Sequence, residues 1–306
     1  MSPPSDSTKQ PDTVGGPSIR LVGFVVHTGR DHAVDAATSL SAWLADRGIV
    51  TRSVEGTDMK ADEIVPNERF PDGLDLVISV GGDGTFLRAA HMAVLADCPV
   101  LGVNMGRMGF LTEVGEEGAI ELLQQVVDGG GVIEERMAVV ARGEGTSWTE
   151  EQWALNEVMV EKGARNRVVR LMVMLDDEYV TTFSGDGVIV ATPTGSTGYS
   201  FSARGPIVSP SVNCLVVTPV AAHMVFDRAF VIGADERVTI EVTGDEAGLF
   251  SADGLQALEI PVGARIHVRA ADRPARLVRG QQETFYRRVR TRFQLPGMGP
   301  DVTPPL

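Results

Sequence analysis

The sequence predicts two joined folds: an N-terminal doubly wound parallel α/β domain and a C-terminal β-rich domain that resembles a β-sandwich. Up to Gly131, short apolar runs alternate with amphipathic stretches, as the strands and helices of a parallel sheet do. Beyond Gly131, segments rich in Val, Met, Ile and Thr are separated by turn signals, and few are long enough for a helix. A chain of 306 residues, 43% of them hydrophobic, is long enough to bury two cores.

The first domain is expected over residues 18–133. It follows a tail at residues 1–17 whose Pro, Ser, Asp, Thr and Gly cannot bury enough apolar area to order it. An apolar run at residues 19–26 predicts the first strand, and residues 49–54 predict the second. A helix is predicted between them because apolar residues recur on one face, namely Val34, Ala37, Leu40, Trp43 and Leu44.

Two further strands and two further helices complete the predicted α/β pattern. Residues 74–80 are nearly continuous in apolar residues, as a strand covered on both faces of a parallel sheet should be. Residues 99–103 predict another short strand. The helical spacing that follows these two strands involves Phe86, Ala90, Ala93 and Val94, and then Ile120, Leu123 and Val127.

The β-rich domain is expected over residues 134–274, with turn signals at 176–177, 185–187 and 244–245. Residues 275–295 are expected to pack back on the first domain, with a helix between about residues 280 and 293, and residues 296–306 should form a flexible tail. That helix carries four arginines, Arg287, Arg288, Arg290 and Arg292. We expect them to form its solvent-exposed face and not a nucleic-acid binding patch.

Charge and composition narrow the function classes. A formal charge of −14 repels phosphate backbones, so nucleic acid is not an expected partner. No window approaches the roughly 20 apolar residues of a membrane span, and no signal peptide opens the chain, so we expect a cytoplasmic protein with no membrane partner. Cys98 and Cys214 lie in apolar surroundings and are expected to be buried thiols.

The loop Gly81-Gly82-Asp83-Gly84-Thr85 carries the main functional signal. A glycine loop between a strand and a helix gathers backbone N–H groups and the positive end of the helix dipole, which suits an anion. Asp83 would repel a triphosphate unless it holds a bridging divalent cation or accepts a proton from an attacking hydroxyl, and both are kinase chemistry. An ordinary Asp-Gly turn is the alternative interpretation.

Two familiar nucleotide sites are absent from the sequence. There is no Gly-x-x-x-x-Gly-Lys-Ser/Thr loop, and the first predicted strand runs into His27-Thr28-Gly29-Arg30 without a Gly-x-Gly-x-x-Gly fingerprint. Hydride transfer is therefore disfavoured.

Three further motifs follow the glycine loop in order. They are residues 102–106 (Gly-Val-Asn-Met-Gly) with 109–111 (Gly-Phe-Leu), Asn156-Glu157, and Asp186-Gly187 running into residues 192–200 (Thr-Pro-Thr-Gly-Ser-Thr-Gly-Tyr-Ser). With the loop, this series resembles the NAD kinases over roughly residues 19–270. Gly-Gly-Asp-Gly alone also occurs in phosphofructokinases and in diacylglycerol and sphingosine kinases, so such kinases are the nearest rival. A catalytically inactive nucleotide-sensing module is a rival of another class.

The resemblance implies phosphorylation of the 2′-hydroxyl of the adenosine ribose of NAD, with ATP as donor and Mg²⁺ or another divalent cation as cofactor. By analogy with bacterial members, inorganic polyphosphate is an alternative donor, and homodimers or homotetramers are expected. Asp83 would be the catalytic proton acceptor. The residues expected to bind substrate or nucleotide are Gly81, Gly82, Gly84, Thr85, Arg88, Asn104, Asn156, Glu157, Arg167, Asp186, Thr197, Gly198, Tyr199, Ser200, Phe201 and Ser202.

The sequence departs from the family pattern at two places. His223 stands in Ala-His-Met-Val where Pro-His-Ser-Leu is usual, and Gln256 follows Asp253-Gly254-Leu255 where Asp-Gly-Gln is usual. His223 and Gln256 are therefore candidates to approach the site without an assigned role. No set of protein ligands for a metal is assigned.

Overall fold

The computed structural model describes residues 19–296 except residues 107, 165, 223–225 and 281–283. The chain divides into two compact units, which we call the α/β unit (residues 1–135 and 276–306) and the β-rich unit (residues 136–275). The expected tail at 1–17, and the expected tail at 296–306 apart from Pro296, lie outside the described residues.

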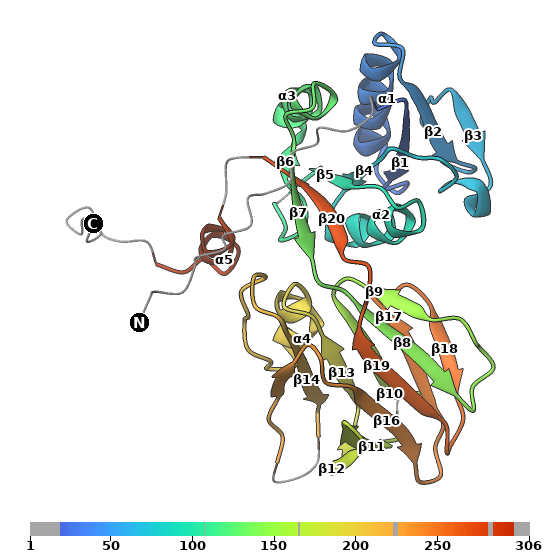
Figure 1. Ribbon diagram of the computed structural model, residues 1–306, viewed down its shortest axis with the longest axis vertical. Coiled ribbons are helices and arrows are strands. Elements are labelled where there is room, and N and C mark those ends of the chain that lie inside the picture. Colours follow the sequence, from blue (N-terminus) through green and yellow to red (C-terminus); the bar gives the residue numbers. More distant parts are fainter. Residues whose placement is uncertain (1–18, 107, 165, 223–225, 281–283, 297–306) are drawn as a thin grey trace, which may run out of the picture. The chain divides into compact units, whose positions relative to one another are not determined.

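A parallel sheet forms the centre of the α/β unit (Figure 1). The pairs β2–β3, β1–β2, β1–β4, β4–β5, β5–β6 and β5–β20 are all parallel, and β1 lies between β2 and β4. In the described residues the order is β3 (Glu63–Val65), β2 (Val50–Val54), β1 (Leu21–Val26), β4 (Leu76–Gly81), β5 (Val100–Asn104), β20 (Ala275–Arg279) and β7 (Val132–Arg136), with β6 (Val114–Gly115) also paired to β5.

Helices cover both faces of this sheet, which confirms the doubly wound prediction. Residues of α1 (Asp31–Ala45) and α3 (Glu116–Val127) share one core cluster with Leu76, Ile78 and Val80 of β4. Helix α2 (Asp83–Leu95) covers the other face, where the Phe86 ring lies against Gly102 of β5 (Figure 1). Every residue of β4 is buried, as expected for a strand covered on both faces.

The predicted apolar stripes need one correction. Ile120 was expected on the buried face of α3 but is 45% exposed. The buried stripe of that helix consists of Ala119, Leu122, Leu123 and Val126. These residues keep the 3.6-residue period, and Ile120 lies beside the stripe because it follows Ala119 by only one position.

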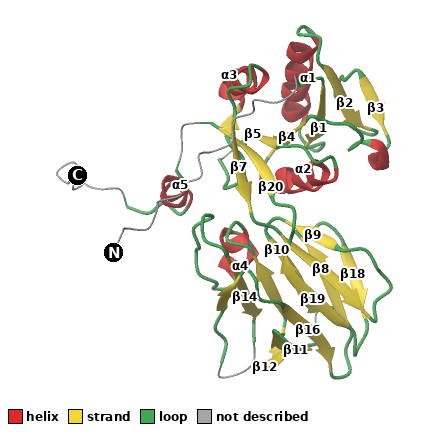
Figure 2. Ribbon diagram, in the orientation of Figure 1, coloured by secondary structure: helices red, strands yellow, loops and turns green. Residues whose placement is uncertain are grey.

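The β-rich unit contains two antiparallel sheets, which confirms the prediction for this half (Figure 2). Their inner faces share one core cluster that includes Val139, Val160, Leu171 and Phe250. Among described residues, one sheet has the order β15 (Phe230–Gly233), β14 (Cys214–Val220), β13 (Gly187–Ala191), β10 (Glu157–Lys162), β17 (Gly248–Ala252) and β18 (Ala257–Ile260). The other has the order β12 (Glu178–Gly185), β11 (Val169–Leu175), β16 (Val238–Thr243), β19 (Arg265–Ala270), β8 (Val139–Glu144) and β9 (Gln152–Ala154).

Short helical turns complete the described elements. They are the 3-10 helices η1 (Asn67–Arg69) and η2 (Gly195–Thr197) and the one-turn helix α4 (Tyr199–Ser202). The last helix, α5 (Phe285–Arg292), is where a helix was predicted.

The arginines of α5 do not all lie on a solvated face, which corrects that expectation. Arg287, Arg290 and Arg292 are exposed, but Arg288 is buried. Its Nη2 is 2.6 Å from Glu113 Oε2, and Arg279 Nη1 is 2.8 Å from the same oxygen. A buried carboxylate shared by two arginines therefore ties α5 and β20 to the segment before α3.

Both cysteines are buried and free, as predicted. Burial raises the pKa of the Cys98 thiol to about 12, and it also raises the pKa of Cys214. Over the described residues, the helices are all too short or too polar to cross a membrane.

Candidate functional site

The glycine loop of the α/β unit joins β4 to α2. Strand β4 ends at Gly81, Gly82 caps the helix, and the first helical bond runs from Phe86 N–H to the Gly82 carbonyl at 3.0 Å. Gly81 pairs with Asn104, so the carboxyl ends of β4 and β5 lie side by side. In open parallel sheets, ligands bind outside these ends, and the N-terminus of α2 adds its dipole there.

Asp83 is held by a second loop of the same unit. Its Oδ2 accepts a hydrogen bond from Phe110 N–H at 2.9 Å, and its Oδ1 accepts one from Leu111 N–H at 3.1 Å. A Cβ at Gly109 would lie 2.0 Å from Oδ1, so only glycine permits this approach. Each oxygen keeps a lone pair, because a carboxylate oxygen accepts two hydrogen bonds. The half-buried carboxylate is therefore oriented and still able to accept a proton.

The other predicted residues of this unit surround the same strand ends. Asn104 is buried, and its Nδ2 donates to the Gly106 carbonyl at 2.5 Å. Thr85 is buried beneath Gly81, whose missing Cβ would lie 2.5 Å from Thr85 Oγ1. Gly84 and Arg88 are exposed on the first two turns of α2.

In the β-rich unit the structure brings together two motifs that are distant in sequence. The Asn156 carbonyl accepts a hydrogen bond from Thr192 N–H at 2.8 Å, and Thr192 Oγ1 donates to the Leu155 carbonyl at 2.7 Å. A Cβ at Gly195 would lie 2.1 Å from the Asn156 carbonyl oxygen. The predicted Asn-Glu pair therefore packs directly on the Thr-Pro-Thr-Gly turn.

This contact leaves two buried oxygens without a hydrogen-bond partner. They are Asn156 Oδ1 and Glu157 Oε2, for which no donor occurs in the described part of the chain. Burial raises the pKa of Glu157 to about 8, with a further contribution from the Asp253 charge and partial compensation by a backbone hydrogen bond from Tyr199. The carboxyl group is therefore mostly protonated at neutral pH. Unsatisfied buried polar atoms beside a glycine-rich turn indicate a place where a ligand completes the hydrogen bonding.

Asp253 is a residue of this cluster that the sequence analysis did not select. Its Oδ2 accepts from Leu155 N–H at 2.8 Å, and its Oδ1 accepts from Asn156 N–H at 2.8 Å and Glu157 N–H at 3.1 Å. The sequence marked Asp253 only as part of the Asp-Gly-Leu-Gln stretch that resembles the family's Asp-Gly-Gln pattern, which does not reveal its hydrogen-bond partners. Asp253 therefore fixes the backbone that presents Asn156 and Glu157.

The remaining predicted residues of the short turn are divided between surface and interior. Ser200 is fully buried, and its hydroxyl shares a hydrogen bond with Thr218 Oγ1 at 2.9 Å, so it supports the turn from within. Tyr199, Phe201 and Ser202 are exposed. The other two predicted residues here are Thr197, whose Oγ1 donates to the Thr194 carbonyl, and Gly198, whose missing Cβ would lie 2.9 Å from Glu157 Oε2.

Arg167 and Asp186 lie away from this cluster. Asp186 pairs with Lys162 at 2.5 Å, at the opposite end of β10 from Glu157. At about 3.3 Å per residue, that end is roughly 17 Å from Glu157. Arg167 pairs with Glu246 at 2.8 Å, close to where Gly248 joins the same end of β10. Gln256 is exposed in the turn beyond Asp253, and His223 lies outside the described residues.

Comparison with known proteins places these features in a family. The family model described as the ATP-NAD kinase N-terminal domain matches residues 22–131, and that of the ATP-NAD kinase C-terminal domain matches residues 155–280. An NAD kinase of Mycolicibacterium paratuberculosis is 39% identical over 92% of this chain and 98% of its own length. NAD kinase 2 of Streptomyces avermitilis is 37% identical over 92% of this chain and 96% of its own length.

Solved structures agree on the fold. Yeast NADH kinase in complex with NADH matches with a TM-score of 0.85 at 20% identity, over 96% of this chain and 94% of that chain. An NAD kinase from Archaeoglobus fulgidus in complex with ATP matches with a TM-score of 0.68 at 23% identity, over 91% of this chain and 99% of that chain.

A parallel α/β unit with an aspartate-bearing glycine loop, followed by an antiparallel β-rich unit, defines a class of two-domain phosphotransferases. Within this class, the two matched family models and the 39% sequence identity to a full-length NAD kinase identify the family. The chain belongs to the NAD kinase family. Family membership therefore supports the prediction of an NAD kinase over its two rivals, a lipid or sugar kinase and a nucleotide-sensing module without catalytic activity.

Proposed function

We propose that this enzyme transfers the γ-phosphate of ATP to the 2′-hydroxyl of the adenosine ribose of NAD, giving NADP. The observation that supports this most directly is the Asp83 carboxylate, which two backbone N–H groups orient at the end of β4 beside the glycine loop. Related structures hold ATP in one case and NADH in the other. Both substrates of the proposed reaction thus have counterparts on this fold.

Each cluster suits one part of the reaction. The N–H groups of the glycine loop and the first turn of α2 would hold the transferring phosphate, with Arg88 beside them. Asp83 would accept the proton of the ribose hydroxyl as its oxygen bonds to the γ-phosphorus and the bond from that phosphorus to the bridging oxygen breaks, releasing ADP. Asn104 would support the loop, since its amide is already bonded to the Gly106 carbonyl.

In the β-rich unit, Asn156 and Glu157 would bind the adenosine half of NAD. Asn156 Oδ1 is an acceptor without a partner, and the protonated Glu157 carboxyl can donate as well as accept. Thr197 to Ser202 would shape the adjoining wall, with Ser200 acting from the interior. Arg167 and Asp186, at the other end of β10, would contact the far part of the dinucleotide.

A divalent cation would bind at this site together with ATP, coordinated mainly by the phosphates. The described residues contain no group of three or more His, Cys, Asp or Glu side chains that could hold a metal. Mg²⁺ is usually held by one or two carboxylates together with substrate phosphates, so the triphosphate would supply most of its ligands. When bound, the cation neutralises phosphate charge.

Three further properties are part of this proposal. Inorganic polyphosphate is included as a second donor, because backbone N–H groups recognise phosphate and not a nucleoside. The protein is expected in the cytoplasm, where free thiols such as Cys98 and Cys214 are maintained. The edge strands of the two β sheets offer surfaces for a homodimer or homotetramer.

Replacement of Asp83 tests the proposal. For Asp83→Asn we expect turnover to fall about 10²-fold or more, the usual scale for a general base, while the Kd for NAD stays within a few-fold. NADP formation from ATP, Mg²⁺ and NAD is the assay, and calorimetry gives the Kd. The matched control is Asp31→Asn, which changes an exposed aspartate in the first turn of α1 and should leave turnover unchanged. Near-normal turnover in a folded Asp83→Asn enzyme would contradict the assignment.

A further inference from the structure

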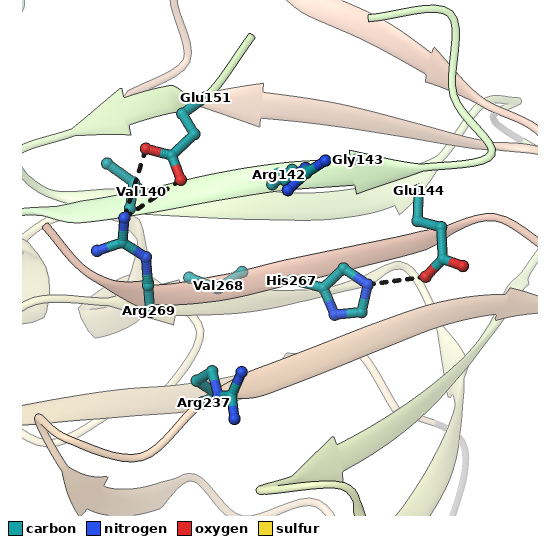
Figure 3. Close-up of a pocket in the computed structure, with 9 residues that line it drawn as sticks. All are labelled: Val140, Arg142, Gly143, Glu144, Glu151, Arg237, His267, Val268 and Arg269. Atoms are coloured by element: carbon teal, nitrogen blue, oxygen red, sulfur yellow. Dashed lines mark hydrogen bonds and ion pairs between the residues drawn. The ribbon is translucent and has the colours of Figure 1, made fainter. Parts of the chain in front are cut away.

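A hollow on the outer face of the β-rich unit shares no residue with the candidate kinase site (Figure 3). It has a volume of about 680 Å³ and lies over β8 and β19, with Arg237 just before β16. Its charged and titratable lining residues are Arg142, Glu144, Glu151, Arg237, His267 and Arg269. All six belong to one unit.

Strand register explains why positive groups gather there. In the β8–β19 pair, Arg142 lies opposite His267. In the β16–β19 pair, Val238 lies opposite Val268, so continuing the ladder by one residue sets Arg237 opposite Arg269. Val238 and Val268 are buried in the core, and side chains alternate along a strand. Their neighbours Arg237 and Arg269 therefore point outward, on the same face as Arg142 and His267 (Figure 3).

Two of these groups have their charge or hydrogen bonding satisfied within the protein. Arg269 forms ion pairs with Glu151 and Asp272, both at 3.2 Å. His267 Nε2 lies 3.0 Å from Glu144 Oε2, and the hydrogen bond between them lowers the pKa of Glu144. The other ring nitrogen, Nδ1, lies 3.1 Å from Thr239 Oγ1. The acidic residues of the hollow are thus engaged with Arg269 and His267.

Arg142 and Arg237 differ from these neighbours. Within the described residues, neither guanidinium forms an ion pair or a side-chain hydrogen bond, although the charge of Arg142 helps to lower the pKa of the nearby Glu144. Arg237 lies opposite Arg269, and like charges directly opposite each other destabilise a sheet. Two unpaired arginines in one hollow, in a chain with a formal charge of −14, form a local site for an anion.

We propose that this hollow is a second binding site for a short phosphate chain, with Arg142 and Arg237 as its principal ligands. The guanidinium fork matches phosphate oxygens in a bidentate manner. Arg142 and Arg237 are two strands and two residues apart, which separates their Cα atoms by roughly 11–12 Å. A diphosphate or triphosphate can contact both guanidinium groups more readily than a single orthophosphate. The chain would be inorganic or the phosphate tail of a nucleotide.

The test is calorimetric titration of the full-length protein with inorganic triphosphate. We expect a binding event that weakens at least tenfold in the double variant Arg142→Gln/Arg237→Gln. The control Arg170→Gln/Arg265→Gln removes the same charge from the same sheet, and neither of its residues lines the hollow. NADP formation should be unchanged in both variants, and thermal melting without ligand checks that both are folded.

The outcomes separate the possible explanations. Two results would overturn the proposal. If the double variant and the control both bind triphosphate as wild type does, Arg142 and Arg237 are not its ligands. If both bind it equally weakly, the overall charge of the protein explains the binding. Orthophosphate binding as tightly as triphosphate would also overturn it. If the Arg142- and Arg237-dependent event is at least tenfold tighter with ATP than with triphosphate, the ligand is a nucleotide. Equal affinities identify the phosphate chain alone.

Discussion

Two carboxyl groups, Asp83 and Glu157, show how local surroundings set different chemical properties. Asp83 is half-buried, and each of its oxygens accepts a backbone N–H, an arrangement that suits an ionised carboxylate. Glu157 has a buried oxygen without a partner and lies near the charge of Asp253, so its neutral form is favoured. Backbone donors orient the first group, and the second can donate a hydrogen bond.

The raised pKa of Glu157 predicts a pH-dependent stability. Its pKa is raised to about 8, mainly by burial, from an ordinary value of about 4.3. Between these values the folded state binds more protons than the unfolded state, so the free energy of unfolding should fall as pH rises and level off above about 8. Glu157→Gln cannot ionise, so it should be more stable relative to wild type at pH 9 than at pH 5.

Urea unfolding at pH 5, 7 and 9 measures this difference. The control is Glu178→Gln, at an exposed position in β12, for which the difference from wild type should not change with pH. A Glu157→Gln protein whose stability relative to wild type is the same at pH 5 and pH 9 would disprove the buried neutral carboxyl.

Sequence and structure differ in how well they reveal single residues. The glycine loop and the Asn156-Glu157 pair could be selected from local motifs, because glycines and polar residues at strand ends have few other uses there. Asp253 could not, because its three backbone partners lie nearly a hundred positions earlier and nothing local encodes them. Arg288 was misjudged for the same reason, since Glu113 is its distant partner.

At the scale of elements, a loop and a helix jointly determine where Asp83 points. Helix α2 begins at Asp83, and the loop that follows β5 brings Gly109 and two N–H donors against the carboxylate. Hydrophobic periodicity predicted the surrounding strands and helices, because one buried stripe or one buried strand is enough to reveal an element. It could not predict this loop, whose conformation depends on the contact with α2.

A methyl group at position 109 should disturb this arrangement. In Gly109→Ala the new Cβ would lie 2.0 Å from Asp83 Oδ1, so the carboxylate must move. A misplacement of about 1 Å can cost about 10²-fold in rate, and we expect a turnover loss of that order. Steady-state NADP formation measures it. Gly115→Ala is the control, because a Cβ there meets nothing within 4 Å, and it should keep its activity. Full turnover in Gly109→Ala would refute the positioning role of the loop.

For the whole molecule, the main feature is that the chain leaves the α/β unit and later returns to it. The β-rich unit occupies residues 136–275, and β20 then enters the parallel sheet between β5 and β7. Arg279 of β20 and Arg288 of α5 both pair with the buried Glu113. This carboxylate thus joins the last part of the chain to a segment encoded much earlier.

Loss of Glu113 should weaken that connection. Glu113→Gln removes the charge that Arg288 and Arg279 share, while Arg279 keeps its ion pair with Glu134, and we expect the free energy of unfolding to fall by about 3 kcal/mol. Among the described residues, faster hydrogen exchange should be confined to residues 276–280 and 284–292 and their partners. Arg290→Gln, at an exposed position of the same helix, should change stability by no more than about 0.5 kcal/mol. Similar losses in the two variants would argue against the Glu113 connection.

The position of β20 also sets an order of events during synthesis. Ribosomes add about 5–20 residues per second, so β20 emerges roughly 10 to 35 seconds after β5, its neighbour in the sheet. The β-rich unit, continuous in sequence, can fold during that interval, whereas the α/β sheet must wait with one strand missing. Because β5 carries Asn104 at its end, the sheet beside the glycine loop is completed only after the whole β-rich unit has been translated.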